Sequence, residues 1–412
     1  MRRRVLRALG VLHILAGLAL NPWLLGRLLS PDGSIDSLFF KTAVLALEAA
    51  LLALGAFTLA RPGSERAANL NLLALSSVVA APLLGESAWR AAIASGSKKL
   101  RDPALYAEYS SDDDYWKLEQ RWGPRWKAAS PERVHPLLGW SQDRVTAENP
   151  LGLSKASLRR LRSAKPKLLF YGDSFVRGAA DPGFRLPEYL DARVGRMTVV
   201  DLGVGGFGLD QTYLMFRETH PKTRGPVVLV GVFLDDLDRS ALTVRSSQKP
   251  YFVADPAGRL TLAGIPVEKD QPSFFASHPA SIRSFLWAFV RRTVLKRTDP
   301  GKAELKRRVN GGLLDLFQAE AGRTRTRVLF ALFYGEADLR ATPWQEEFLK
   351  RELELRGLPY VDTKPLLLGH ARASGAGLPS FYSSGDGHHN NLGNRVIAEG
   401  ILARLRELGF VR

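Results

Sequence analysis

A serine at position 174 stands where a short apolar run gives way to a turn. The run Lys167–Tyr171 is typical of a buried strand, and Gly172-Asp173-Ser174 ends it abruptly before a helix-like segment, which Asp173 is expected to cap. A hydroxyl at the C-terminal edge of a parallel sheet, beside a helix N-terminus, lies close to backbone N–H groups that help a nucleophile. Ser174 is therefore a candidate nucleophile, which needs a base, an acid to orient that base, and an oxyanion hole.

A candidate base lies near the C-terminus, in the run Ser384-Gly-Asp-Gly-His-His-Asn-Asn-Leu-Gly393. Asp386 precedes His388 by two residues on a loop that contains glycine. This spacing lets the carboxylate fold back onto the imidazole Nδ1–H, which leaves Nε2 free to accept a proton from a serine. Taken alone, the same loop could also be a plain turn or a chance grouping of metal-ligating residue types.

The elements that must position these residues alternate between strands and helices from about residue 165 onward. Five short runs are apolar on both faces, as strands of a covered parallel sheet are: 167–171, 198–202, 227–233, 328–333 and 358–361. Helical patterns lie between them, and residues 392–408 carry apolar side chains on one face. This alternation predicts a three-layer α/β/α, flavodoxin-like domain with a parallel sheet, whose active site lies at the carboxyl ends of the strands.

Two other stretches complete the predicted organisation of the soluble part. Residues 240–325 interrupt the domain 151–412 as an insertion, with a hairpin around Asp255–Gly258 and a basic helical segment after it. The insertion is either a lid or wall for a substrate, or padding. Residues 96–150 form a connector rich in Tyr and Trp, whose rings either stack on sugars or hold the connector in place.

The first 95 residues are expected to form a membrane anchor. Three apolar segments, Val5–Leu29, Ala43–Ala60 and Leu70–Ile93, each approach the ~20 residues that a helix needs to cross a bilayer. A cleaved signal peptide is disfavoured because no clear small-residue cleavage site follows the first segment. A soluble helical bundle is disfavoured because polar faces are scarce. We therefore predict about three transmembrane helices, and hence a multi-pass protein of the cell membrane.

Positive residues suggest how the anchor is oriented. The N-terminal ones are Arg2, Arg3, Arg4 and Arg7. They predict a cytoplasmic N-terminus, so three crossings would place the C-terminal domain outside the cytoplasm. Lys98, Lys99 and Arg101 favour the opposite orientation, but long domains are translocated largely regardless of charge.

Composition narrows the possible partners and chemistry. The formal net charge is +17, with a denser basic run at Arg291–Arg308 that is either a solvated helical face or a contact with anionic lipid or an acidic polymer. Zinc-finger, basic-zipper and RNA-binding signatures are missing from the sequence, so a nucleic-acid partner is not expected. The chain has no Cys, which excludes disulfides and thiolate catalysis. We expect neither a metal nor a cofactor.

The motifs around the candidate site resemble a known family. Gly172-Asp173-Ser174 and Asp386-Gly387-His388, with the glycines between them, are similar to the SGNH (GDSL) hydrolase superfamily over roughly residues 135–412. The run His135-Pro-Leu-Leu-Gly-Trp140 and the hairpin insertion resemble membrane-associated, exopolysaccharide-modifying members. The resemblance implies that Ser174 is the nucleophile, His388 the base and Asp386 the acid that orients it. His388-His-Asn-Asn-Leu-Gly393 matches the family's His-x-Asn-x-x-Gly, whereas a strict Asp-x-x-His spacing would select His389.

The same resemblance implies an oxyanion hole with three donors. These are the backbone N–H of Ser174, the backbone N–H of Gly206 in Asp201-Leu-Gly-Val-Gly-Gly206, and an Asn side chain at the position that Asp235 occupies here. An ionised Asp cannot donate a hydrogen bond, and a missing donor typically costs ~10²–10³ in rate. Either burial keeps Asp235 protonated, or two backbone donors suffice, or the site is weakened.

The expected function is that of a membrane-anchored serine esterase or O-acyltransferase. Its substrates would be acyl esters, mainly acetyl esters, of cell-envelope or secreted glycans, with acylated lipid as the alternative substrate. A membrane acyltransferase is a possible partner, because the chain holds no acyl-donor domain. The competing hypothesis is a catalytically weakened subunit that keeps the SGNH fold for glycan binding or assembly.

Overall fold

The structure is a computed structural model of the 412-residue chain and describes residues 2–29, 38–223, 226–295 and 299–411. The chain divides into two compact units. The first comprises Met1–Tyr109 and Ala280–Pro300, and the second comprises Ser110–Pro279 and Gly301–Arg412. The predicted connector thus contributes to both units, and part of the predicted insertion belongs to the first.

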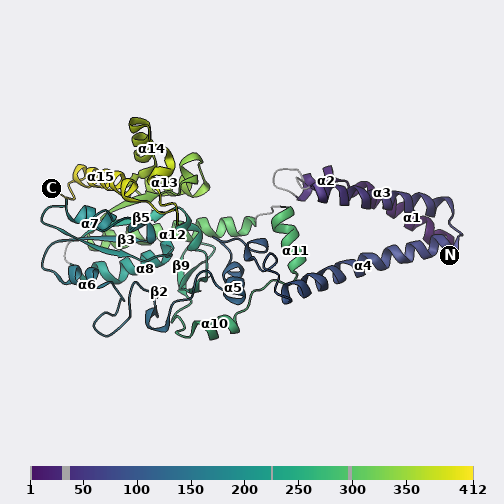
Figure 1. Cartoon of the computed structure of the whole chain (residues 1–412), viewed down its shortest axis with the longest axis horizontal. Coiled ribbons are helices and arrows are strands. Elements are labelled where there is room, and N and C mark those ends of the chain that lie inside the picture. The colour runs from purple at the N-terminus through teal and green to yellow at the C-terminus, as the bar shows by residue number, and fades with distance from the viewer. Residues whose placement is uncertain (1, 30–37, 224–225, 296–298, 412) are drawn as a thin grey trace. The chain divides into compact units, whose positions relative to one another are not determined.

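A five-stranded parallel sheet forms the centre of the second unit (Figure 1). Its strands are β3 (Lys167–Gly172), β4 (Thr198–Gly203), β5 (Val227–Phe233), β10 (Arg327–Phe333) and β11 (Tyr360–Asp362), in the order β11-β10-β5-β3-β4. Every residue of β3 and β5 is buried, as expected for strands that are apolar apart from Lys167 at the start of β3. The five predicted strands and the parallel sheet are confirmed.

Helices cover both faces of this sheet. The chain reverses its direction across the sheet after β4, so right-handed crossovers place α7 on one face and α8 and α12 on the other. The helices of this unit are α5 (Asp113–Trp122), α6 (Lys155–Arg162), α7 (Leu186–Asp191), α8 (Leu209–Thr219), α9 (Asp235–Arg239), α10 (Gln271–Ser277), α12 (Pro300–Thr324), α13 (Trp344–Leu355), α14 (Thr363–Ser374) and α15 (Asn391–Glu407). Phe317 of α12 packs on Phe216 of α8, and Tyr189 of α7 donates a hydrogen bond to Glu399 of α15. The three-layer α/β/α prediction is confirmed.

The predicted hairpin of the insertion is also present. Strands β8 (Tyr251–Ala254) and β9 (Leu260–Ala263) pair antiparallel around a turn in which the Asp255 carboxylate accepts hydrogen bonds from the amides of Ala257 and Arg259. After α10 the chain enters the first unit at Ala280, forms α11 (Phe285–Phe289), and returns to the second unit at Gly301.

The first unit contains α1 (Arg2–Ala19), α2 (Pro22–Leu29), α3 (Leu38–Ala60) and α4 (Glu65–Ala94). The prediction of one continuous helix over Val5–Leu29 is wrong. The helix stops at Ala19, and Asn21 caps a new helix by accepting from the amide of Leu24, with Pro22 at its first position. Among the described residues two helices, α3 and α4, are long and apolar enough to cross a membrane, which is weak evidence for an anchor.

Close helix packing joins α1 to α3 within this unit. A Cβ atom added at Gly55 of α3 would lie 2.6 Å from Ile14 Cγ1 and 2.8 Å from the Gly10 carbonyl oxygen of α1. Glycine is therefore required where the two backbones approach, as is common for helix pairs in lipid.

Candidate active site

The nucleophile turn follows β3 directly. Gly172 has φ 145°, and a Cβ there would lie 2.5 Å from the Gly231 carbonyl oxygen, so only glycine allows this sharp exit from the sheet. Asp173 caps the next turn by accepting from the amide of Phe175 at 2.8 Å. That turn, Ser174–Val176, is a single 3₁₀ turn rather than the expected helix. Local backbone amides, and not a long helix dipole, therefore lie beside the Ser174 hydroxyl.

The structure brings the three sequence-predicted catalytic side chains together. His388 Nε2 lies 2.7 Å from Ser174 Oγ, and His388 Nδ1 lies 3.2 Å from Asp386 Oδ2. Asp386 Oδ1 also accepts from the backbone amide of His388 at 3.1 Å. Burial opposes the charge on Asp386, but the amide and imidazole of His388 together lower the pKa of this carboxyl below its ordinary value. The arrangement can take a proton from Ser174 and stabilise the imidazolium that forms.

The loop that carries His388 is fixed at both ends. Ser383 donates its amide hydrogen to the His388 carbonyl at 2.8 Å, and Gly387 adopts φ 74°. Asn390 then caps α15 by accepting from the amides of Leu392 and Gly393. The Asn and Gly residues that follow the histidines thus start the helix and hold the loop in place.

His389, the alternative base, points into the core instead. Its side chain is fully buried and packs edge-on against Phe175, with ring centroids 5.1 Å apart. Burial, and then the neighbouring His388, lower the pKa of His389 to about 3. No hydrogen bond joins it to Ser174 in the part of the chain that the structure describes.

A cavity of about 300 Å³ opens at the nucleophile. Its lining consists of Arg133, Gln142, Asp173, Ser174, Arg177, Gly178, Gly203, Val204, Gly205, Asp386 and His388. Arg133 donates through Nε and Nη2 to the Ser141 carbonyl at 3.1 and 2.6 Å, whereas Arg177 is paired with Asp201 at 2.8 Å. Sequence reasoning missed both arginines. Arg177 lies only three residues after Ser174, whereas Arg133 reaches the cavity only in the folded chain.

The glycine loop after β4 supplies a second wall. A Cβ added at Gly205 would lie 3.8 Å from Ser174 Cβ, and the Gly205 carbonyl accepts a hydrogen bond from Trp140 Nε1 at 3.0 Å. The peptide that joins Gly205 to Gly206 is trans, so the N–H of Gly206 points away from that indole. Trp140 therefore fixes the plane of the peptide that carries the predicted oxyanion donor.

The third predicted oxyanion residue is outside the cavity lining. Asp235 is the first residue of α9, is half-buried, and is not among the described residues that line the cavity. Its charge instead contributes to raising the pKa values of Asp236, Asp238 and Asp338, after the larger effect of their burial. Gly206 is also outside the lining, but its contribution would come from the backbone amide alone.

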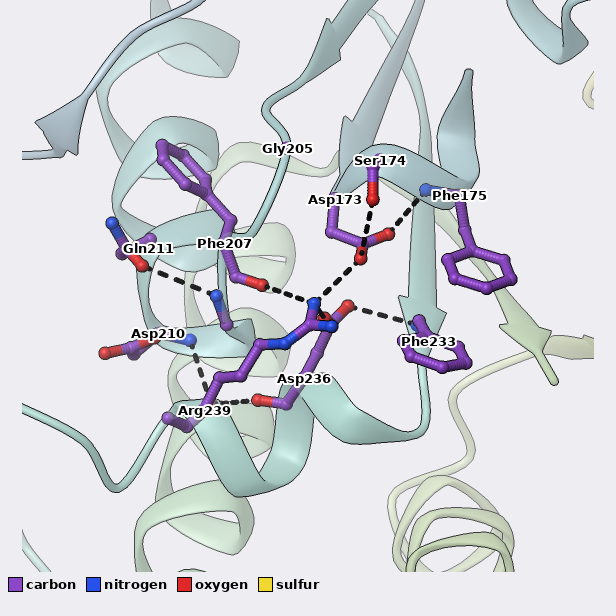
Figure 2. Close-up of polar contacts among 12 residues, drawn as sticks. Asp173, Ser174, Phe175, Gly205, Phe207, Asp210, Gln211, Phe233, Asp236 and Arg239 are labelled. Atoms are coloured by element: carbon purple, nitrogen blue, oxygen red, sulfur yellow. Dashed lines mark hydrogen bonds and ion pairs between the residues drawn. The ribbon is translucent and has the colours of Figure 1, made fainter. Parts of the chain in front are cut away.

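A buried ionic network supports the nucleophile turn (Figure 2). Arg239 Nη1 lies 2.8 Å from Asp173 Oδ2 and 2.6 Å from Asp236 Oδ1, and Asp236 Oδ2 accepts from the amide of Phe233 at 3.0 Å. Burial, and then Asp173, raise the pKa of Asp236 well above its ordinary value. Burial opposes the charge on Arg239, but the two carboxylates raise the pKa of its guanidinium. The network ties the turn after β3 to α9 after β5.

Metal binding finds no support in the described residues, which hold no group of three or more His, Cys, Asp or Glu side chains arranged as ligands. No protein-family model and no curated protein matches the sequence.

Comparison with solved structures finds matches that are described as hydrolases. They include a lipase/acylhydrolase from Enterococcus faecalis (11% identity, 60% of this chain, 97% of that chain, TM-score 0.35). A G-D-S-L family lipolytic protein from Veillonella parvula matches at 15% identity over 57% of this chain and 96% of that one, with TM-score 0.34. An acetylxylan esterase from Geobacillus stearothermophilus matches at 14% identity over 61% and 99%, also with TM-score 0.34. Of these three descriptions, the one from Veillonella parvula names the G-D-S-L family.

Proposed function

We propose that this chain is a serine esterase or O-acyltransferase that acts on acyl esters of glycans at a membrane. The observation that carries the proposal is the chain of contacts from Ser174 Oγ through the His388 ring to the Asp386 carboxylate. The substrate class follows from the sequence resemblance. The cavity beside Ser174, whose lining includes arginine, glutamine and aspartate side chains, is compatible with a sugar ester. Acetyl is the acyl group we expect.

The reaction would proceed in two steps. His388 Nε2 accepts the hydroxyl proton of Ser174 while Oγ attacks the ester carbonyl carbon, and the tetrahedral oxyanion is held by the amides of Ser174 and Gly206. The oxyanion collapses to an acyl-enzyme as the alcohol leaves with the proton from His388. Water or a sugar hydroxyl then gives its proton to His388 and takes the acyl group from Ser174, whose Oγ recovers a proton from His388 as it leaves.

In this proposal the two backbone donors are helped by the positive charge of Arg133, which lines the same cavity. The guanidinium of Arg133, held by the Ser141 carbonyl, adds positive potential where Asp235 adds none. The competing function is a weakened glycan-binding or assembly subunit, and the Asp at position 235 is the feature that favours it.

Covalent labelling decides between these two functions. A fluorophosphonate should label the full-length protein, and Ser174→Ala should abolish both the labelling and the hydrolysis of p-nitrophenyl acetate. Ser374→Ala, a change near the C-terminus of α14, is the matched control and should behave as the parent protein. Unlabelled protein that still binds acetylated oligosaccharides would support the binding subunit instead.

The proposed location is the cell membrane, with α3 and α4 as crossing helices and α1 packed against α3 as a third. We propose a cytoplasmic N-terminus and a catalytic domain outside the cytoplasm, where secreted glycans and a membrane acyltransferase partner would be reached. The basic N-terminal end of α1 supports this orientation.

A further inference from the structure

The segment from Ser284 to Val294, inside the predicted insertion, folds on α4 in the first unit. It contains α11 and a π-helical turn, Val290–Val294. Its place in the molecule is unusual because the chain leaves the second unit at Pro279 and returns only at Gly301. The chain therefore has two further covalent connections between the units, one on each side of this segment, besides the one after Tyr109.

Glu86 of α4 holds the start of α11. Its carboxylate accepts from Ser284 Oγ at 2.8 Å and from the amides of Phe285 and Leu286 at 3.1 and 3.0 Å, and it pairs with Arg90 at 2.6 Å. The first N–H groups of a helix have no partner within the helix, and leaving them unpaired is costly near lipid. Glu86 satisfies them and is itself neutralised.

The position of Glu86 along α4 coincides with the expected edge of a bilayer. The 19 residues Ala67–Gly85 contain no Asp, Glu, Lys or Arg. At 1.5 Å per residue they span about 28 Å, close to the ~30 Å hydrocarbon core. The next residue is Glu86, so α11 docks where α4 would leave the hydrocarbon.

The side chains around this docking point suit a lipid headgroup region. Trp89 packs on Phe289 at 4.9 Å and donates to the Tyr106 hydroxyl at 3.0 Å, while Trp287 is 55% exposed. Tyr and Trp concentrate at membrane–water interfaces. The exposed cationic residues near these side chains in the sequence include Lys98, Lys99, Arg283 and Arg291.

We propose that Ser284–Val294 is an interfacial anchor that lies in the headgroup region of an anionic bilayer. Trp287 would sit at the level of the glycerol and upper acyl chains, and the exposed cations would contact lipid phosphates. The inference rests on the membrane location proposed above and is independent of the chemistry at Ser174.

Site-directed labelling can test the depth directly, because the chain has no cysteine. Trp287→Cys in the full-length protein would carry an NBD fluorophore in liposomes of phosphatidylcholine and phosphatidylglycerol. Leu72→Cys, at a 66% exposed position in the charge-free run, and Val253→Cys, at a 50% exposed position in β8, are the matched controls. At position 287, we expect lipids that carry a shallow quencher to quench the NBD fluorescence about twofold more strongly than lipids that carry a deep quencher. Position 72 should show the reverse, and aqueous iodide should quench position 253.

Each other outcome has a defined meaning. Iodide quenching at 287 as strong as at 253, with 72 still quenched by deep lipids, overturns the anchor segment and leaves the membrane helices in place. Iodide quenching at 72 as well overturns the membrane location itself. Protection of 287 from both lipid and iodide overturns the inference in favour of a protein partner or a second copy. Glu86→Gln should raise iodide quenching at 287, whereas Glu65→Gln, at the other end of α4, should not.

Discussion

At the scale of single residues, His388 and His389 show how position decides the role of one residue type. The His388 side chain is 23% exposed between Ser174 and Asp386, whereas His389 is fully buried among aromatic rings. A buried imidazolium without a carboxylate partner is costly, so His389 stays neutral and serves packing. Only His388 has the contacts that a general base needs.

The buried His389 predicts an acid-sensitive fold. Its pKa falls from 6.5 to about 3 on folding, so between these pH values the unfolded chain binds a proton that the folded chain does not. The His389 imidazole contributes fully to the free energy of unfolding above pH 6.5. As the pH falls toward 3, the free energy of unfolding decreases by about 1.4 kcal/mol per pH unit. His389→Leu should flatten the pH dependence of the thermal midpoint between pH 6.5 and 4.5. An unchanged slope would contradict a neutral His389.

Trp140 offers a second test at this scale. Trp140→Phe keeps the ring but removes the hydrogen bond to the Gly205 carbonyl, so the Gly206 amide should lose its orientation. We expect kcat to fall about tenfold, less than for a deleted oxyanion donor, with KM little changed. Rates of fluorophosphonate labelling should fall in parallel. Trp126→Phe, at a 50% exposed position, is the control, and a fall in thermal stability without a change in kcat would contradict the positioning role.

The sequence alone indicated those candidate-site residues whose contacts are local or that belong to a motif. Asp386 and His388 are two residues apart, and the turn at Ser174 follows an unmistakable strand. The contact of Trp140 with Gly205 joins residues 65 apart and depends on how two loops meet after folding. Arg133 reaches the cavity in the same way, which no spacing in the sequence could indicate.

At the scale of elements, the network of Arg239 holds three parts of the fold together. Asp173 follows β3, Asp236 lies in α9, and the Phe207 carbonyl, 3.4 Å from Arg239 Nη1, belongs to the loop after β4. The i,i+3 spacing of Asp236 and Arg239 is visible in the sequence, but the link to Asp173 is not. The network couples the nucleophile turn to the glycine loop.

Removing the cation of this network should be severe. Arg239→Met leaves two buried carboxylates without a partner, and we expect a loss of about 3–5 kcal/mol in the free energy of unfolding. Arg259→Met breaks an ion pair whose arginine is 84% exposed and should cost at most about 0.5 kcal/mol. Denaturant unfolding of the full chain in detergent measures the stability of both variants. Adding Asp236→Asn to Arg239→Met should restore part of the lost stability. Equal midpoints for the two single variants would contradict the structural role.

The predictions of helices and strands were wrong where tertiary packing or a local helix cap outweighed the hydrophobic pattern of the sequence. The five strands were predictable because parallel strands covered on both faces are apolar throughout. The turn at Ser174 was predicted as a helix, but Gly178 with φ 65° and the packing of Val176 against β3 and β5 end it after one turn. The first apolar segment was predicted to supply one crossing helix, but its helix ends at Ala19, and Asn21-Pro22, a cap followed by a favoured first helical residue, begins a new one.

At the scale of the whole molecule, the number of crossing helices decides on which side of the membrane the domain with Ser174 lies. If α3 and α4 alone cross, the chain returns to the side on which it began, and the arginines at the start of α1 would then keep the domain cytoplasmic. A third crossing by α1 reverses this. Val11, Leu12, Leu15 and Leu18 of α1 are 47–58% exposed, and the helix packs on α3 through glycine. An apolar helix with such a face is stable next to lipid, so we favour three crossings.

Reporter fusions test whether two or three helices cross the membrane. An alkaline phosphatase, active only outside the cytoplasm, should be active when fused after Leu29 or after Arg101 and inactive after Gly63. Deletion of residues 2–29 removes one crossing, so the Arg101 fusion should lose its activity while a cytoplasmic reporter at the same site gains it. The Gly63 fusion is the internal control, because it must change in the opposite sense. Cytoplasmic activity of the undeleted Arg101 fusion would show that α1 does not cross, and the substrates of Ser174 would then have to be sought inside the cell.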